Sequence, residues 1–269
     1  MTAIEKESTL IAIIKEMKKV AIAFSGGVDS TYLIAIAQKT LGENAVAITL
    51  KTEYISNRDI NESINLTALI KIKHIVIKIN ALENKQIVAN TEQRCFFCKT
   101  EMYKHLIDAA KECGINNYAD GSNIDDLKED RPGLKALRNL EFRSPLQEAG
   151  LSKDDIRYLS KRLNLPTWNK SSYSCLATSI PFGNNLTITK IEQIEKAEDF
   201  LRTLGIKQFR VRHHDTIARI EISHNNFYQL ILNQDLIIPF FIQLGFIYVT
   251  LDLRGYQTVS LDEVAQKEG

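Results

Sequence analysis

One short stretch of the chain, Ser25-Gly-Gly-Val-Asp-Ser30, combines residue types that suit phosphate chemistry. Its two adjacent glycines let the backbone approach a ligand closely and adopt positive φ angles. The hydroxyls of Ser25, Ser30 and Thr31, with free amides at a helix start, suit a phosphate group. Asp29 could hold a Mg²⁺ ion that bridges phosphate oxygens. The sequence therefore predicts an anion-binding loop, formed by residues 25–30.

The standard nucleotide-binding fingerprints are missing from the chain, which contains no G-x-G and no G-K-[ST]. A P-loop kinase or a Rossmann dehydrogenase is therefore not indicated. A Gly-rich turn that merely links a strand to a helix is the plain alternative. The position of the loop, after an apolar stretch and at the start of a helical pattern, favours phosphate binding.

A second group of reactive side chains is formed by three cysteines. Cys95 and Cys98 are spaced C-x-x-C at the start of a predicted helix, where the helix dipole, Arg94 and Lys99 favour thiolates. This pair alone allows a zinc site, a redox disulfide or an iron–sulfur site. The chain has no second C-x-x-C and no H-x-x-x-H, which disfavours zinc. With Cys175, three thiolates could hold three corners of a [4Fe–4S] cube and leave one iron open.

The fourth cysteine and the overall composition are less informative. Cys113, near the end of a predicted helix, is interpreted as an ordinary buried cysteine. The 269 residues include 34 basic and 33 acidic side chains, a net charge of +1 that argues against a nucleic-acid-coating surface. No apolar run is long enough for a signal peptide or a membrane span, so we expect a cytoplasmic protein with reduced thiols.

Strand and helix patterns alternate along the first half of the chain, which predicts an α/β fold with a doubly wound parallel sheet. Ligands of such sheets bind at the carboxyl ends of the strands, where the 25–29 and 120–123 turns would lie. Ser152 and Asp155 match a capping box that would start a helix. The predicted strands are 20–24, 45–50, 74–79 and 117–119, and the helices are 4–17, 30–41, 56–70, 96–113 and 153–163.

We expect two domains, 1–183 and 184–269, the second a smaller α+β domain. Its predicted elements are helices at 189–204 and 225–236 and strands at 208–213, 217–222 and 246–251. The first helix would start at a capping box, Thr189 to Glu192. Arg210 and Arg212 alternate on a strand, so both face one way and could bind a mononucleotide phosphate.

Several motifs together resemble one family. Ser-Gly-Gly-x-Asp-Ser is similar to the pyrophosphate-loop (PP-loop) motif of the N-type ATP pyrophosphatases, and the whole set resembles the LarE family. These are ATP-dependent sulfur transferases that help build the nickel-pincer cofactor of lactate racemase. The similarity runs from about residue 19 to residue 253, and its further motifs are Asp120–Asn123 with Asp125–Leu127, Arg131–Leu137, Arg143–Leu146, Leu165–Trp168, Cys175–Ala177, Phe209–His214 and Ala218–Glu221.

The resemblance implies that carboxylates of pyridinium-3,5-biscarboxylic acid mononucleotide are adenylated and then converted to thiocarboxylates. The implied cofactors are ATP, Mg²⁺ and a [4Fe–4S] cluster, and the implied sulfur source is sulfide or another sulfur donor. The resemblance also implies a homo-oligomer, such as a hexamer, that binds neither nucleic acid nor a membrane. In one subgroup the cysteine at the Cys175 position gives up its own sulfur. The presence of all three cysteines favours the cluster subgroup.

The site residues that follow are Asp29 and Cys175 for catalysis; Ser25, Gly26, Gly27, Asp29, Ser30 and Gly121 for the nucleotide; Arg210 and Arg212 for the substrate phosphate; Cys95, Cys98 and Cys175 for the cluster; and Glu198 and Glu221 for a divalent metal.

The sequence departs from the family at Thr178 and Ser179, where Ser and Arg are usual, and at Ser171-Ser172, where a proline is expected. The missing arginine bears on substrate recognition. A tRNA thiolase of the same superfamily is the alternative, but the net charge of +1 and the lack of an RNA-binding module disfavour it. A non-catalytic zinc- or cluster-binding regulator is the other alternative.

Overall fold

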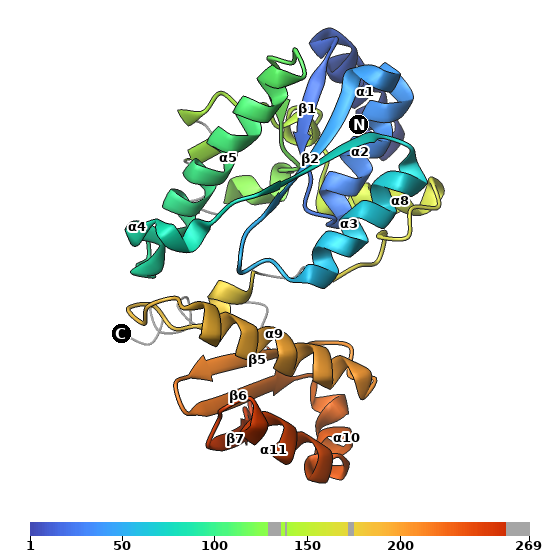
Figure 1. Ribbon diagram of the computed structural model, residues 1–269. Coiled ribbons are helices and arrows are strands. Elements are labelled where there is room, and N and C mark those ends of the chain that lie inside the picture. Colours follow the sequence, from blue (N-terminus) through green and yellow to red (C-terminus); the bar gives the residue numbers. More distant parts are fainter. Residues whose placement is uncertain (129–135, 138, 172–174, 257–269) are drawn as a thin grey trace. The chain divides into compact units, whose positions relative to one another are not determined.

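The computed structural model describes residues 1–128, 136–137, 139–171 and 175–256 (Figure 1). The chain divides into two compact units. The first consists of Met1–Ala81 and Cys95–Tyr173, and the second of Leu82–Arg94 and Ser174–Gly269. The second unit thus includes a segment from the first half of the chain. The predicted single division between residues 183 and 184 assigns that segment to the first domain. Residues 131–135 of one family motif and Ser172 lie outside the described residues.

A parallel sheet forms the centre of the first unit and confirms the predicted α/β class. Its strands are β1 (Val20–Ala23), β2 (Ala45–Lys51), β3 (Lys73–Lys78) and β4 (Tyr118–Ala119), in the order β3-β2-β1-β4. β1 pairs in parallel with β2 on one side and with β4 on the other. The strand order therefore reverses between β1 and β4, and a crevice for ligands is expected at their carboxyl ends.

Helices cover both faces of this sheet, as a doubly wound fold requires (Figure 1). The hydrophobic core on one face of the sheet includes Leu33, Leu66 and Ile156, and the core on the other face includes Leu106 and Ala110. The helices on the first face are α1 (Ala3–Met17), α2 (Val28–Leu41), α3 (Asn57–Ile70) and α8 (Lys153–Arg162), and α5 (Arg94–Glu112) covers the second. The short helix α7 (Pro145–Glu148) precedes α8.

The predicted capping box at the start of α8 is confirmed. The Ser152 hydroxyl accepts from the backbone N–H of Asp155 at 3.2 Å, and the Asp155 carboxylate accepts from the backbone N–H of Ser152 at 3.0 Å. This reciprocal pair satisfies two donors at the helix start. It fixes Lys153 as the first residue of α8.

The second unit has a small mixed sheet of β5 (Phe209–His214), β6 (Ile217–Ile222) and β7 (Tyr248–Leu251). β5 and β6 are antiparallel, and β6 and β7 are parallel. Phe209, Phe241 and Phe246 are fully buried in its core. The helices of the unit are α4 (Lys85–Val88), α9 (Ile188–Thr203), α10 (Phe227–Leu232) and α11 (Gln234–Gln243).

Two sequence predictions for this unit are wrong in detail. The helix expected at 225–236 is divided into α10 and α11 at Asn233, whose side-chain amide donates to the carbonyl of Gln229 at 2.8 Å. Asn side chains compete with the backbone for such carbonyls and so favour helix ends. The N-cap of α9 is Thr187 and not Thr189, since the Thr187 hydroxyl accepts from the N–H of Lys190 at 3.2 Å.

Candidate functional site

The predicted anion loop connects β1 to α2, as expected. Gly26 has φ +72°, and Gly27 precedes the first residue of α2 without any side-chain cap. The hydroxyls of Ser25 and Ser30 lie 3.2 Å apart, so the loop closes on itself. Thr31 is fully buried, and its hydroxyl therefore does not face the loop surface as predicted. The amides of the first turn of α2 remain available to an anion, which is the typical geometry of a phosphate site.

Gly121 is required where the end of β4 approaches this loop. A Cβ atom at Gly121 would lie 3.0 Å from the backbone nitrogen of Ser30 and 3.2 Å from its Cα. Real Cβ atoms rarely come so close to backbone. The structure therefore explains the glycine by its packing against Ser30, and the predicted contact of Gly121 with a nucleotide stays a prediction.

Asp29, the predicted magnesium ligand, is held by two side chains of the same unit. Its Oδ2 accepts a hydrogen bond from the ammonium of Lys153, and its Oδ1 accepts from the amide of Asn123 at 3.4 Å. The side chains of Asp29 and Lys153 are 20% and 29% exposed, so solvent and ions can reach this pair. The backbone N–H of Lys153 donates to Asp125 Oδ2 at 2.9 Å, which anchors the start of α8 beside the loop.

A second lysine that the sequence analysis did not single out contacts the loop backbone. Lys170 donates from Nζ to the carbonyl of Gly26 at 3.0 Å and forms an ion pair with Glu62 at 2.8 Å. Arg157 of α8 donates to the carbonyls of Trp168 and Lys170, each at 2.9 Å, and so holds this segment in place. The loop is thus flanked by the cationic side chains of Lys153 and Lys170.

Asp120, directly after β4, is a buried carboxyl group. It accepts hydrogen bonds from the hydroxyls of Ser122 and Ser144, the latter at 2.6 Å. Burial raises the pKa of Asp120 above its usual range, although these hydrogen bonds and Lys99 oppose the shift. The bonds tie the Asp120–Asn123 turn to the start of α7, and this turn supplies Gly121 and Asn123 to the loop site.

Cys95 and Cys98 lie one turn apart at the start of α5, as the spacing predicts, and both are half-buried cysteines outside any disulfide. The sulfur of Cys98 lies 2.7 Å from the hydroxyl of the buried Tyr54 and 3.4 Å from the sulfur of Met102. Cys113 packs against the core of the same unit and accepts from Lys73 Nζ at 3.7 Å. Cys113 is only partly buried, so its interpretation as an ordinary buried cysteine is correct for its packing but not for full burial.

Cys175 belongs to the second unit, where it precedes a short 3-10 helix, Leu176–Ser179. Its carbonyl accepts from the backbone N–H of Thr178 at 3.1 Å and from the Thr178 hydroxyl at 2.7 Å. Arg94, which was expected to favour the thiolates of Cys95 and Cys98, donates to the carbonyl of Ala177 at 3.0 Å in this unit. These bonds fix the turn that carries the Cys175 thiol.

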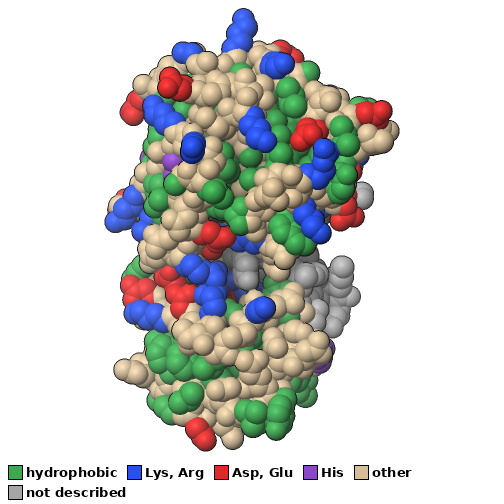
Figure 2. Space-filling view, turned by 90° about the vertical axis from the view of Figure 1, so that its right-hand side faces the viewer, with side chains coloured by type: hydrophobic (Ala, Val, Ile, Leu, Met, Phe, Trp, Pro, Cys, Tyr) green, Lys and Arg blue, Asp and Glu red, His purple; other side chains and the backbone are tan. Residues whose placement is uncertain are grey.

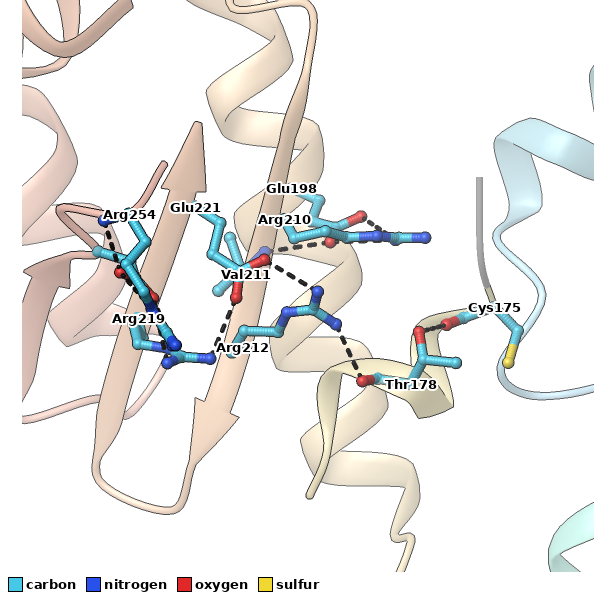
Figure 3. Close-up of polar contacts among 10 residues, drawn as sticks. Cys175, Thr178, Glu198, Arg210, Val211, Arg212, Arg219, Glu221 and Arg254 are labelled. Atoms are coloured by element: carbon cyan, nitrogen blue, oxygen red, sulfur yellow. Dashed lines mark hydrogen bonds and ion pairs between the residues drawn. The ribbon is translucent and has the colours of Figure 1, made fainter. Parts of the chain in front are cut away.

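Two buried arginine–glutamate pairs lie beside this turn (Figure 3). Arg210 donates to both carboxylate oxygens of Glu198 at 3.3 Å, and Arg212 donates to Glu221 at 2.9 Å. Both guanidinium groups extend from the same face of β5, as their alternation predicts (Figure 3). Arg212 also donates to the carbonyl of Thr178 at 3.0 Å, so the cysteine turn and the arginine strand are linked.

Glu198 and Glu221 each neutralise a buried arginine. Their binding of a divalent metal, and that of the substrate phosphate by Arg210 and Arg212, stay predictions. Glu221 pairs with Arg219 as well, at 3.0 Å. Burial lowers the pKa of Arg210, but Glu198, with smaller contributions from Tyr256 and Cys175, raises it overall. Among the described residues, no three His, Cys, Asp or Glu side chains form a group that could hold a metal ion.

The fold and the loop define a class of protein, the PP-loop enzymes that use ATP. Residues 10–108 match the NAD synthase family, and this stretch contains the β1–loop–α2 unit. Across the described residues, no helix has the length and apolar character needed to cross a membrane.

Comparisons over the full length are more specific. The chain is 33% identical to the pyridinium-3,5-bisthiocarboxylic acid mononucleotide synthase of Lactiplantibacillus plantarum over 267 residues, 99% of this chain and 97% of that protein. It is 39% identical to an uncharacterized protein of Synechocystis sp. over 94% of this chain and 95% of that one. A Methanocaldococcus jannaschii protein is 32% identical over 90% of this chain and 92% of its own length. The chain therefore belongs to the LarE family, that of pyridinium-3,5-bisthiocarboxylic acid mononucleotide synthase.

Proposed function

We propose that this protein is an ATP-dependent sulfur transferase of nickel-pincer cofactor biosynthesis. Its substrate would be pyridinium-3,5-biscarboxylic acid mononucleotide, whose carboxylates become thiocarboxylates. The observation that carries the proposal is a PP-loop at the carboxyl end of β1, in a chain that matches the Lactiplantibacillus plantarum synthase over nearly its whole length. The same loop supports ATP and Mg²⁺ as the molecules bound there.

The first step is adenylation. A substrate carboxylate oxygen attacks the α-phosphorus of ATP, and the bond to the β-phosphate oxygen breaks to release pyrophosphate. The amides at the start of α2 and the hydroxyls of Ser25 and Ser30 would bind the leaving pyrophosphate. Asp29 would hold the Mg²⁺ ion, which neutralises charge on the phosphate oxygens. Adenylation makes AMP the leaving group of the next step. Without it, the carboxylate would have to expel a hydroxide-like group, which leaves poorly.

Arg210 and Arg212 are the groups we assign to the phosphate of the mononucleotide. Their guanidinium groups share one face of β5, and the buried Nε of Arg212 has no partner among the described residues. Glu198 and Glu221 orient the two guanidinium groups and offset their charge, so we assign these carboxylates a positioning role. The link from Arg212 to Thr178 would couple a bound phosphate to the turn that carries Cys175.

Sulfur transfer is the second step, in which a sulfur nucleophile attacks the acyl adenylate and AMP leaves. We propose that Cys95, Cys98 and Cys175 ligate a [4Fe–4S] cluster. The chemistry of the donors fits: all three are partly exposed cysteines outside any disulfide, and three thiolates satisfy three irons of a cube. When bound, the cluster would supply an open iron for an exogenous sulfide. The turn at Cys175 would hold its thiol in place through the bonds from Thr178.

We further propose that the protein forms a homo-oligomer in the cytoplasm. Apolar side chains are exposed on α10, α11 and the strand that follows, and Figure 2 shows hydrophobic side chains on the surface of this unit. Such a surface on a soluble monomer is unusual. The residues are Tyr228, Ile231, Leu232, Leu236, Ile238, Ile242, Ile247 and Tyr248.

Pyrophosphate release tests the adenylation step directly. Purified protein with ATP, Mg²⁺ and pyridinium-3,5-biscarboxylic acid mononucleotide should release pyrophosphate, and nicotinic acid mononucleotide serves as the matched substrate with a single carboxylate. The proposal fails if the dicarboxylate does not stimulate release.

The sulfur source is tested by two measurements on anaerobically prepared protein. We expect a broad visible absorbance and about four irons per chain, lost when Cys95 or Cys98 is replaced by Ala but kept in Cys113→Ala. Mass spectrometry before and after turnover should show an unchanged protein mass. A loss of one H₂S at Cys175 would instead establish sacrificial donation.

A further inference from the structure

The cation that now neutralises Asp29 is the ammonium of Lys153. Lys153 binds Oδ2 of Asp29, and the other side chain that hydrogen-bonds this carboxylate within the described residues, Asn123, is neutral and 3.4 Å from Oδ1. The carboxylate is thus already charge-paired before any Mg²⁺ binds. This contact matters because, in the proposed function on which the inference rests, Asp29 holds Mg²⁺.

We propose that Lys153 is an exchangeable counter-ion of Asp29. In the ligand-free protein its ammonium pairs with the carboxylate; when ATP and Mg²⁺ bind, Mg²⁺ takes Oδ2, and the released ammonium pairs with an oxygen of the β- or γ-phosphate. Lys153 thereby makes the binding of free Mg²⁺ unfavourable and the joint binding of Mg²⁺ and polyphosphate favourable.

Charge and coordination chemistry favour the exchange. Mg²⁺ demands short, near-ideal octahedral bonds to oxygen. An ammonium within hydrogen-bond distance of the same oxygen atom repels the ion, so joint occupancy of Oδ2 by both cations is unfavourable. Binding of the nucleotide adds several negative charges at the loop, which gives the displaced ammonium a new partner.

The position of Lys153 suits this exchange. It is the first residue of α8, where its backbone N–H is fixed by a hydrogen bond to Asp125 Oδ2 at 2.9 Å. Only its side chain needs to move. That side chain is 29% exposed, and a lysine has a flexible four-carbon stem with a compact charge.

Lys170, the other lysine at the loop, contrasts with Lys153. Its ammonium has a carboxylate partner of its own, Glu62, at 2.8 Å, and it binds the neutral carbonyl of Gly26. Mg²⁺ at Asp29 would therefore not compete with Lys170 for its partners. We assign the exchange to Lys153 alone and a loop-positioning role to Lys170.

Calorimetric titration with two probes tests the exchange: Mg²⁺ alone, and inorganic pyrophosphate at saturating Mg²⁺. Lys153→Met should bind Mg²⁺ alone about tenfold more tightly and Mg²⁺-pyrophosphate about tenfold more weakly than the parent protein. Lys6→Met is the matched control, because it removes another ion-paired lysine that contacts α8. It should change neither affinity, and thermal melting verifies that both variants are folded.

The outcomes separate this inference from the proposed function. If Asp29→Ala leaves both affinities unchanged, the magnesium site is misassigned and the proposed function of Asp29 fails. If binding depends on Asp29 but Lys153→Met shifts both affinities in the same direction, or neither, the exchange is overturned. It is also overturned if no variant binds Mg²⁺ without pyrophosphate. Lys153→Gln repeats the measurement should the Met variant fail to fold.

Discussion

The loop site of the first unit and the arginine–glutamate pairs of the second differ in how far their charged side chains are exposed to solvent. Asp29 and Lys153 are 20% and 29% exposed, and the loop offers backbone amides to a ligand. In the second unit, the side chains of Arg212 and Glu221 are 4% and 2% exposed. An exposed pair costs little to separate, whereas a buried pair is costly to break. The first site is therefore built to exchange ions, and the second to hold its charges fixed.

The largest effect should follow removal of the loop carboxylate. We expect Asp29→Ala to lower the rate of pyrophosphate release about 10³-fold, because charge on the leaving group loses its metal. The free energy of unfolding should change by less than about 1 kcal/mol, since the pair is partly exposed. Steady-state pyrophosphate assays and urea unfolding measure the two quantities. Asp154→Ala, an exposed carboxylate on α8, is the control; a large loss of stability in Asp29→Ala would remove the contrast between the units.

Breaking a pair in the second unit should affect stability most. Glu198→Gln removes the carboxylate that offsets the buried charge of Arg210 and should lower the free energy of unfolding by about 3–5 kcal/mol. The double variant Glu198→Leu with Arg210→Met should recover part of this loss, because no buried charge remains unpaired. Urea unfolding followed by circular dichroism measures both. A double variant as unstable as the single one would argue against an isolated-charge penalty.

The second unit should also respond to acid through His213. This side chain is buried, and burial, with a smaller contribution from Lys190, lowers its pKa to about 4. The unfolded chain, with an ordinary pKa near 6.5, binds the proton first, so stability falls as the pH drops from about 6.5 to 4, by at most about 3 kcal/mol. His213→Gln should flatten this part of the unfolding profile. An unchanged slope in the variant would assign the pH dependence to other groups.

The smallest effect should come from the contact between β4 and the loop. Gly121→Ala places a Cβ atom 3.0 Å from the Ser30 nitrogen, so the loop must shift. We expect KM for ATP to rise about tenfold, with a stability loss of about 1–2 kcal/mol. Gly183→Ala meets no atom within 4 Å but has φ +81°, so it should cost stability without changing KM. Equal KM values for the two variants would contradict the assigned packing.

The sequence predicted well the features that local spacing determines. Residues 25–30 combine two glycines with a following helix, and the structure places 25–27 between β1 and α2 and 28–30 in the first turn of α2. The alternation of Arg210 and Arg212 likewise predicted their shared face on β5, because the side-chain period of a strand is two.

Partners distant in the sequence were not predictable in the same way. Lys153 and Lys170 reach the loop across 124 and 144 residues, and a lysine at a helix start or in a turn has no local signal of its partner. The partner of Arg210 comes from α9 and that of Arg212 from β6, so their pairing depends on how these elements pack. The ion pairs of Glu198 and Glu221 with these arginines were not predictable from the sequence for the same reason.

The segment Leu82–Arg94 limits how this protein can be shortened. The amide of Asn90 donates to the carbonyls of Ile180, Pro181 and Asn184 at 3.2, 2.8 and 3.0 Å, and Leu186 donates to the carbonyl of Val88 at 2.9 Å. A fragment that starts at residue 184 would leave these donors and acceptors unpaired. Expression of the C-terminal half alone, or a fusion that exchanges it between relatives, must therefore carry residues 82–94 along, for example as a permuted chain.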